Sequence, residues 1–352
     1  MVIKSKYFIF LLLSILIVIT GILSYFFLPE RFFYDALTIT QDFYNEKGWW
    51  GSYPLTMSFY EYTLLGKLPF PIVALIQLPL LLCIIYKLGI PHTFARPTLK
   101  NSLVYISLLL LAFFISMPSK EFITFCYLAL IPFLFKNKKF SLPKTVLLSF
   151  FIFVVFGLWF RIYFVFIPIL ALAMHLLSYI RIKNKIALNI TGALLVAVFL
   201  SLSYGLVKGQ FLTESTREEL NLFRSQSEDA NSMITSPVPA TTWYGEVVSI
   251  FYGFFTVNFP LNGLRHIFKP QIIAFILWQL LLFGFLLYYF KLCISRKREY
   301  KYEIWMFYFV FAYFIIQGIF EPDLGSAVRH KMGYFPLIYF ALYYDHFKRS
   351  IQ

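Results

Sequence analysis

Long apolar runs separated by short basic or polar segments follow one another along the whole chain. The predicted spans are 7–28, 69–86, two within 101–135, two within 145–180, 186–207, 271–290, 304–320 and 332–344. Runs of about 20 apolar residues match the length of a transmembrane helix, and no alternation of the β-barrel type is present in the sequence. The pattern therefore predicts an all-α, polytopic membrane protein, with about ten transmembrane helices in a single transmembrane domain that covers residues 1–352.

Basic residues beside these runs predict their orientation. Lys4 and Lys6 precede the first run, and Lys348 and Arg349 follow the last one. The positive-inside rule places both termini in the cytoplasm, and it leaves periplasmic loops at 29–68 and 208–270 and a periplasmic turn at 321–332. The apolar segment 247–268 either spans or is re-entrant. We choose a re-entrant or interfacial segment, because the basic cluster 296–298 then lies in the cytoplasm.

The net charge of +14 agrees with this orientation. The predicted cytoplasmic loops hold most of the 31 Lys and Arg, but only Glu299, Glu303 and Asp345 of the 17 acidic residues. We therefore attribute the basic excess to contact with anionic lipid and expect no nucleic-acid partner. The three cysteines lack the spacing of a metal site or of a CxxC motif, so we interpret them as packing residues and expect no metal or other cofactor.

Charged residues gather at the predicted outer ends of the apolar runs. Ionisable groups close to a membrane are costly and usually functional, and they commonly face a water-filled cavity. The residues that we expect to share such a cavity are Lys120, Glu121, Arg161, Glu321, Asp323, Arg329 and His330. The alternatives are local ion pairs, a lipid-headgroup anchor and the capping of helix ends.

The first periplasmic loop adds a carboxylate and an aromatic run. Asp35 directly follows the membrane exit, and Trp49, Trp50 and Tyr53 come later in the same loop. Aromatic faces can cover sugar rings, and a nearby carboxylate can bind hydroxyls or remove a proton. The alternatives are an interfacial aromatic belt and a solvated charge.

Two arginines in the second loop form a separate candidate. Arg217 and Arg224 lie two helical turns apart and are expected to project from one helix face. Two guanidiniums on one face can bind a pyrophosphate through bidentate contacts. The acidic neighbours Glu214, Glu218 and Glu219 offer a solvated helix as the alternative, which we prefer.

Three short segments carry a family resemblance. They are the membrane exit 28–35, the hairpin tip Ser119-Lys120-Glu121-Phe122, and the ending 325–330 with Pro336. With the span pattern and the large late loop, they resemble the bacterial O-antigen or capsule repeat-unit polymerases of the Wzy type. A clear Arg-x10-Gly pattern, known in some members, is missing here.

The resemblance implies a metal-independent glycosyltransferase of the bacterial inner membrane. It would act at the periplasmic face and transfer a growing glycan from undecaprenyl pyrophosphate to a new lipid-linked repeat unit, with a chain-length regulator as a further partner. It implies that Asp35 is the base, with Glu321 or Asp323 in reserve. The groups expected to stabilise the pyrophosphate are Lys120, Arg161, Arg329 and His330.

Other classes remain open. An O-antigen ligase, or another glycosyltransferase for lipid-linked sugars, would use the same chemistry. A membrane acyltransferase is disfavoured because the first run contains neither Arg nor His. A glycolipid transporter or flippase is disfavoured because polar residues are scarce within the predicted spans.

Overall fold

The computed structural model describes residues 4–41, 46–224, 232–266 and 268–348, and all the regular elements in these ranges are helices. The all-α prediction is therefore confirmed for these residues. The chain divides into two compact units. The first contains Met1–Ile162 and Arg329–Arg349, and the second contains Tyr163–Val328 and Ser350–Gln352.

Five helices among the described residues are long and apolar enough to cross a membrane. They are Ser5–Phe27, Phe70–Leu88, Leu142–Trp159, Lys185–Lys208 and Ile272–Ser295. The shorter apolar helices are Leu99–Phe114, Ile162–Leu177 and Ile304–Phe320. The chain is thus a multi-pass helical membrane protein, while the count of about ten spans and their orientation stay predictions.

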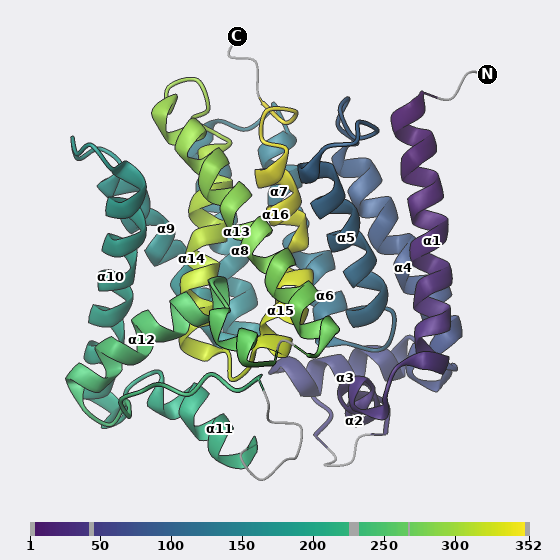
Figure 1. Cartoon of the computed structure of the whole chain (residues 1–352), viewed down its shortest axis with the longest axis horizontal. Coiled ribbons are helices and arrows are strands. Elements are labelled where there is room, and N and C mark those ends of the chain that lie inside the picture. Colours follow the sequence, from purple (N-terminus) through teal and green to yellow (C-terminus); the bar gives the residue numbers. More distant parts are fainter. Residues whose placement is uncertain (1–3, 42–45, 225–231, 267, 349–352) are drawn as a thin grey trace. The chain divides into compact units, whose positions relative to one another are not determined.

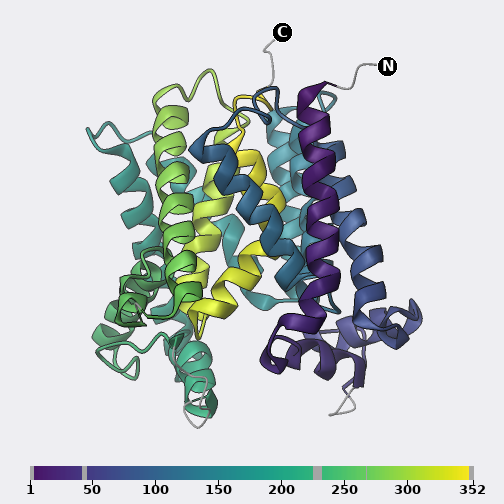
Figure 2. The same ribbon diagram turned by 45° about the vertical axis from the view of Figure 1, so that its right-hand side comes forward.

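In the first unit, α1 (Ser5–Phe27) packs side by side with α4 (Phe70–Leu88) and α5 (Leu99–Phe114), as Figures 1 and 2 show. The shorter helices α2 (Tyr34–Gln41) and α3 (Ser52–Tyr62) lie at the end where α1 leaves its apolar run. The other elements are η1 (Glu30–Phe32), η2 (Leu65–Lys67), α6 (Lys120–Leu128), α7 (Leu130–Lys136), α8 (Leu142–Trp159) and α16 (Phe335–Leu342).

The end of α4 is held by side chains from three other elements. Lys136 Nζ donates to the carbonyls of Lys87 and Leu88, at 2.8 Å each, and Lys6 Nζ donates to Ile90 O at 2.8 Å. Tyr339 of α16 donates to the carbonyl of the intervening Gly89 at 2.9 Å. A helix C-terminus leaves carbonyls without intrahelical partners and carries partial negative charge, so lysine ammonium groups stabilise it.

Two of the predicted spans are interrupted helices. A break at Ala129 separates α6 from α7, three residues before Pro132. Another break, at Tyr334, separates α15 (Leu324–Gly333) from α16, two residues before Pro336. Proline cannot donate the backbone hydrogen bond that a continuous helix requires, and its ring clashes with the preceding turn. The predicted span 332–344 is therefore divided between the end of α15 and α16.

The second unit is built around α14 (Ile304–Phe320), in which the residues from Ile304 to Ile319 are buried. α14 packs against α9 (Phe166–Leu177), α10 (Lys185–Lys208), α12 (Trp243–Asn258) and α13 (Pro270–Ser295). The remaining elements are η3 (Ile162–Val165) at the unit boundary, the π-helical turn η4 (Glu214–Glu218), α11 (Glu219–Arg224) and η6 (Leu261–His266). The segment 247–268 thus forms most of α12 and then η6, with a break at Phe259 and Pro260.

Two glycines let α12 and α14 approach each other closely. A Cβ atom added to Gly318 would lie 2.5 Å from the backbone nitrogen of Phe254, and one added to Gly253 would lie 2.0 Å from the carbonyl oxygen of Gly318. Small residues at such crossings allow backbones to pack directly in membrane proteins. Gly253 and Gly318 therefore lie where the backbones of α12 and α14 pack directly against each other.

Replacement of Gly318 by alanine tests this crossing. The added methyl group meets backbone rather than a movable side chain, so we expect G318A to destabilise the protein by about 1–3 kcal/mol. The matched control is G284A in α13, where an added Cβ meets nothing within 4 Å. It should be neutral or stabilise by about 1 kcal/mol through helix propensity. Thermal unfolding in detergent measures both, and equal melting temperatures would contradict the close crossing.

Candidate functional site

Asp35 is positioned by the sharp exit of the chain from α1. Leu28 is extended (φ −79°, ψ 145°) ahead of Pro29, and the turn η1 leads into α2, whose first turn contains Asp35. Phe33 and Ala36 on either side are buried in an apolar cluster with Met117. The packing of these neighbours fixes the start of α2, and with it the carboxylate of Asp35, within the first unit.

Lys120 and Glu121 begin helix α6, which starts abruptly after Pro118. Ser119 is the N-cap, and its side chain accepts from the backbone N–H of Phe122 at 3.2 Å. The hydroxyl of Tyr60 accepts from the N–H of Ser119 at 3.1 Å. A carboxylate in the first turn is favoured by the exposed N–H groups and the helix dipole, so Glu121 occupies a position that suits its charge.

Asp35 lies between two cationic side chains and one hydroxyl donor. Its Oδ2 is 2.8 Å from Arg329 Nη1 and 3.4 Å from Lys120 Nζ, and its Oδ1 accepts a hydrogen bond of 2.5 Å from the hydroxyl of Tyr53. The Tyr53 ring also covers the ammonium group of Lys120, with 3.4 Å between Nζ and the ring centroid. Both oxygens of Asp35 are thus engaged.

Glu121 holds the neighbouring pair of groups. Its Oε1 accepts from Arg161 Nη2 at 2.8 Å and lies 3.2 Å from His330 Nε2. The side chain of Glu121 has no exposure to solvent, and that of Arg161 is 6% exposed. Arg161 follows the end of α8, whereas His330 lies in α15. This carboxylate therefore connects three elements of the first unit.

We call these seven residues the charge cluster: Asp35, Tyr53, Lys120, Glu121, Arg161, Arg329 and His330. Two adjacent pairs in the sequence bring its two halves together. Lys120 and Arg329 contact Asp35, while the next residues, Glu121 and His330, contact each other. The cluster contains two carboxylates, three side chains that are always or usually cationic, and one histidine, so its positive charge exceeds its negative charge.

The environment of Asp35 favours its charged form. Burial by itself would raise the pKa of this carboxyl, but Lys120 and Arg329 lower it, with help from the Tyr53 hydrogen bond, and the pKa lies below its usual value. Glu121 acts in the opposite direction. The same burial, together with the negative charge of Asp35, raises the pKa of the Tyr53 hydroxyl. Asp35 is therefore an ionised acceptor and Tyr53 a neutral donor at neutral pH.

Arg217 lies in the second unit and binds protein groups. Its side chain is fully buried, Nη1 donates to Gly318 O at 2.5 Å, and Nη2 donates to Ser249 O at 2.9 Å and to the Ser249 hydroxyl. Arg217 belongs to the π-helical turn η4, whereas Arg224 ends α11, so they do not share one regular α-helix. The side chain of Arg224 lies outside the described part of the structure.

The remaining predicted carboxylates also lie in the second unit. Glu321 Oε1 accepts from Gln317 Nε2 at 3.2 Å. Asp323 accepts from the backbone N–H and the hydroxyl of Ser326, at 2.8 Å each, in the manner of a helix cap for α15. Both carboxylates therefore have local partners around the start of α15, and their reserve roles as bases stay predictions.

The structure adds two features that the sequence pattern did not predict. Tyr53 belongs to the predicted aromatic run, but nothing in that pattern links it to a carboxylate 18 positions away. In the second unit, Glu246 Oε1 accepts from Ser201 Oγ at 2.5 Å and from Thr213 through its N–H and its hydroxyl, at 3.2 and 2.9 Å. Long-range pairs of this kind leave no periodic signal in a sequence.

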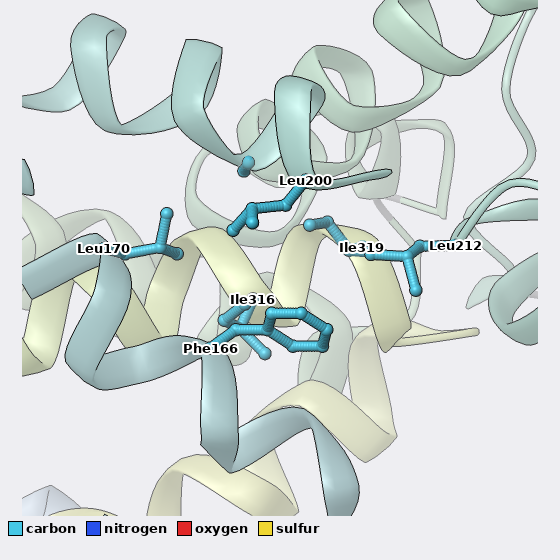
Figure 3. A pocket seen from close by; sticks show the side chains of 7 residues that line it. Phe166, Leu170, Leu200, Leu212, Ile316 and Ile319 are labelled. Atoms are coloured by element: carbon cyan, nitrogen blue, oxygen red, sulfur yellow. The ribbon is translucent and has the colours of Figure 1, made fainter. Parts of the chain in front are cut away.

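An apolar crevice in the second unit, shown in Figure 3, offers no polar group for chemistry. It is lined by Phe166, Leu170, Ala197, Leu200, Leu212, Ile316 and Ile319. Within the described residues, no three His, Cys, Asp or Glu side chains are grouped as metal ligands. The charge cluster is therefore the candidate site, and what it can supply is a set of fixed cations, a histidine and ordered carboxylates.

Replacement of Glu121 tests how the cluster is held together. E121L leaves Arg161 buried without its carboxylate, and we expect it to destabilise the protein by about 3–5 kcal/mol. The double variant E121L/R161L should recover part of this loss. The control is E61L, which breaks an ion pair with Lys47 whose side chains are 46% and 41% exposed and should change stability by less than about 1 kcal/mol. Equal melting temperatures for E121L and E61L in detergent would contradict a buried pair.

Comparison with known proteins identified no relative of this chain. No family model, no curated protein and no solved structure matches the chain. The resemblance to Wzy-type polymerases therefore rests on the sequence alone, that is on the three short segments, the span pattern and the large late loop. Each of these segments contributes side chains to the charge cluster: Asp35 from the first, Lys120 and Glu121 from the second, and Arg329 and His330 from the third.

Proposed function

We propose that this chain is a membrane glycosyltransferase that polymerises lipid-linked oligosaccharide repeat units. Its substrates would be undecaprenyl-pyrophosphate-linked glycans at the periplasmic face of a bacterial inner membrane, and its product an O-antigen or capsular polysaccharide. The observation that carries the proposal is the charge cluster, in which three cationic side chains and a histidine surround two carboxylates. A surplus of fixed positive charge suits a substrate that leaves as a pyrophosphate.

The proposed reaction exchanges one carbon–oxygen bond for another. A hydroxyl oxygen of the acceptor sugar attacks the anomeric carbon of the growing glycan, the bond from that carbon to the pyrophosphate oxygen breaks, and the hydroxyl proton passes to a base. Positive charge develops on the sugar ring, and the bonding electrons leave with the pyrophosphate. Cations fixed before the reaction stabilise the developing negative charge without further reorganisation, and we assign this role to Lys120, Arg161 and Arg329.

The surroundings of Asp35 favour a positioning role for this residue instead of the role of general base. An effective general base has a pKa near the working pH, whereas the pKa of Asp35 is lowered, its Oδ1 accepts a hydrogen bond from Tyr53 and its Oδ2 is paired with Arg329. We therefore assign Asp35 to the positioning of Arg329 and Lys120. We assign the proton transfer to His330, because an imidazole can accept a proton on one ring nitrogen while a carboxylate, here Glu121 at 3.2 Å from Nε2, stabilises the ring.

The clearest test is deletion of the gene in the organism that carries it. Loss of a polymerase should leave surface lipid carrying a single repeat unit, and a gel should show the ladder of longer glycans replaced by that one band. The wild-type gene on a plasmid should restore the ladder. Loss of every repeat unit would point to a ligase or a flippase instead, and an unchanged ladder would contradict the glycan proposal.

Arg329 gives the sharpest single-residue prediction. R329A removes the cation 2.8 Å from Asp35, and we expect chain extension to fall about 100-fold or more, because preorganised charge at the leaving group is lost. R329K keeps the charge without the planar fork and should be intermediate. The control is R96A, at an exposed arginine of the first unit. Ladder density is compared at equal protein level in the membrane, and a normal ladder from R329A would remove Arg329 from the mechanism.

A further inference from the structure

Tyr53 is the member of the charge cluster that carries no charge, and it contacts two members that do. Its hydroxyl donates to Asp35 Oδ1 at 2.5 Å, and its ring centroid lies 3.4 Å from Lys120 Nζ. A phenol is the only one of the 20 side chains that offers an aromatic face and a neutral hydroxyl donor together, because phenylalanine lacks the hydroxyl and serine lacks the ring. One residue therefore fixes a carboxylate and an ammonium group at the same time.

The two oxygens of Asp35 have different partners, and this restricts the carboxylate. Arg329 and Lys120 lie on Oδ2, whereas Tyr53 lies on Oδ1. Without the phenol, rotation of the carboxylate would let either oxygen approach either cation. With the phenol in place, Oδ2 keeps a fixed direction, and the guanidinium and ammonium groups keep fixed positions relative to each other.

The start of α3 is itself tied to the end of α8. Gly51 has a positive φ of +91° that favours glycine, and its N–H donates to the carbonyl oxygen of Trp159 at 3.0 Å. The indole N–H of Trp159 donates to the carbonyl oxygen of Trp49 at 2.6 Å. Arg161, which pairs with Glu121, follows Trp159 by two residues. The hydrogen bonds between Gly51, Trp49 and Trp159 therefore help to position both Tyr53 and Arg161.

We propose that Tyr53 is a positioning residue, which acts through Asp35 and Lys120 to hold the cations that bind the pyrophosphate leaving group. This inference rests on the proposed function. The hydroxyl fixes the direction of Asp35, and the ring keeps the ammonium group of Lys120 beside that carboxylate. Tyr53 itself need not contact the substrate.

The hydrogen bond from Tyr53 also affects the protonation of Asp35. The groups that face Asp35 are Tyr53 from α3, Lys120 and Glu121 from α6, and Arg329 from α15. Tyr53, Lys120 and Arg329 lower the pKa of this carboxyl, against burial and Glu121, which raise it. Removal of the Tyr53 hydroxyl raises the pKa of Asp35. When the pH is lowered, Asp35 in such a variant therefore becomes protonated at a higher pH than in the wild type, and the cations lose their ordered positions there.

The test compares Y53F, which removes only the hydroxyl, with Y53L, which also removes the ring. The matched control is Y62F, which removes the hydroxyl of another tyrosine in the same helix. Membranes from the deletion strain carrying each variant contain the lipid-linked repeat unit that the cell makes, and chain extension is measured between pH 3 and pH 8, a range that includes the acid region in which Asp35 takes up its proton. The rate of each variant is divided by the wild-type rate at the same pH, which cancels titrations common to both.

We expect Y53F to extend chains about tenfold more slowly than wild type at neutral pH, and Y53L more slowly still. The Y53F ratio should fall further as the pH is lowered, whereas the Y62F ratio should stay close to one. A Y53F ratio of one at every pH overturns the proposal. A reduced ratio that is the same at every pH also overturns it, because that is the behaviour of a purely structural contact.

Acid unfolding of the purified variants separates this inference from the proposed function. If Tyr53 fixes Asp35, the melting temperature of Y53F in detergent should decline at a higher pH than that of Y62F, whatever reaction the protein performs. An unchanged ladder in the deletion strain while this shift is present would refute the glycosyltransferase and leave the coupling of Tyr53 to Asp35 standing. Coincident acid unfolding of Y53F and Y62F would refute the coupling.

Discussion

A buried carboxylate in a chain that is 60% hydrophobic imposes the central constraint on the first unit. Glu121 has no exposure to solvent, and an isolated charge in such a position would be strongly destabilising, so cations must lie at contact distance. Arg161 and His330 meet this requirement at one oxygen. The ends of α8 and α15 are consequently brought to the start of α6, and Lys120 and Arg329, the residues just before Glu121 and His330, are brought to Asp35.

The resulting charge cluster has a net positive charge. Asp35 and Glu121 offset two of the positive charges from Lys120, Arg161 and Arg329, and His330 adds to the remainder whenever it is protonated. An anionic group can therefore be attracted to the cluster without removing a carboxylate from its partners. This property, together with the origin of the cluster in the three segments that resemble polymerases, supports the proposal of a pyrophosphate leaving group.

Much of this arrangement follows from local signals in the sequence. Apolar runs predicted the membrane helices, and charges at their ends marked Asp35, Lys120, Glu121, Arg161, Arg329 and His330. Local signals do not predict which residues far apart in the sequence contact each other, or which way their side chains point. The spacing of Arg217 and Arg224 indicated one helix face, but a π-helical turn and a nearby carbonyl, that of Gly318, direct Arg217 into the protein. Tyr53 is one of several aromatic residues in its loop, and only its contacts with Asp35 and Lys120 distinguish it from the others.

Carboxylates inside the proposed anion site weaken its attraction for an anion, yet they also hold the cations in position. Lysine and arginine side chains are long and flexible, and at a membrane surface they extend toward water or headgroup phosphates unless something holds them. Asp35 and Glu121 are short, and they are fixed by Tyr53 and by the start of α6, so they hold the cations in place before any substrate arrives. The two carboxylates reduce the attraction for an anion. In return, the three flexible cationic side chains are already ordered, so that binding does not have to include the entropy loss of ordering them. For stabilisation of a charge that develops during a reaction, fixed positions contribute more than additional mobile charge.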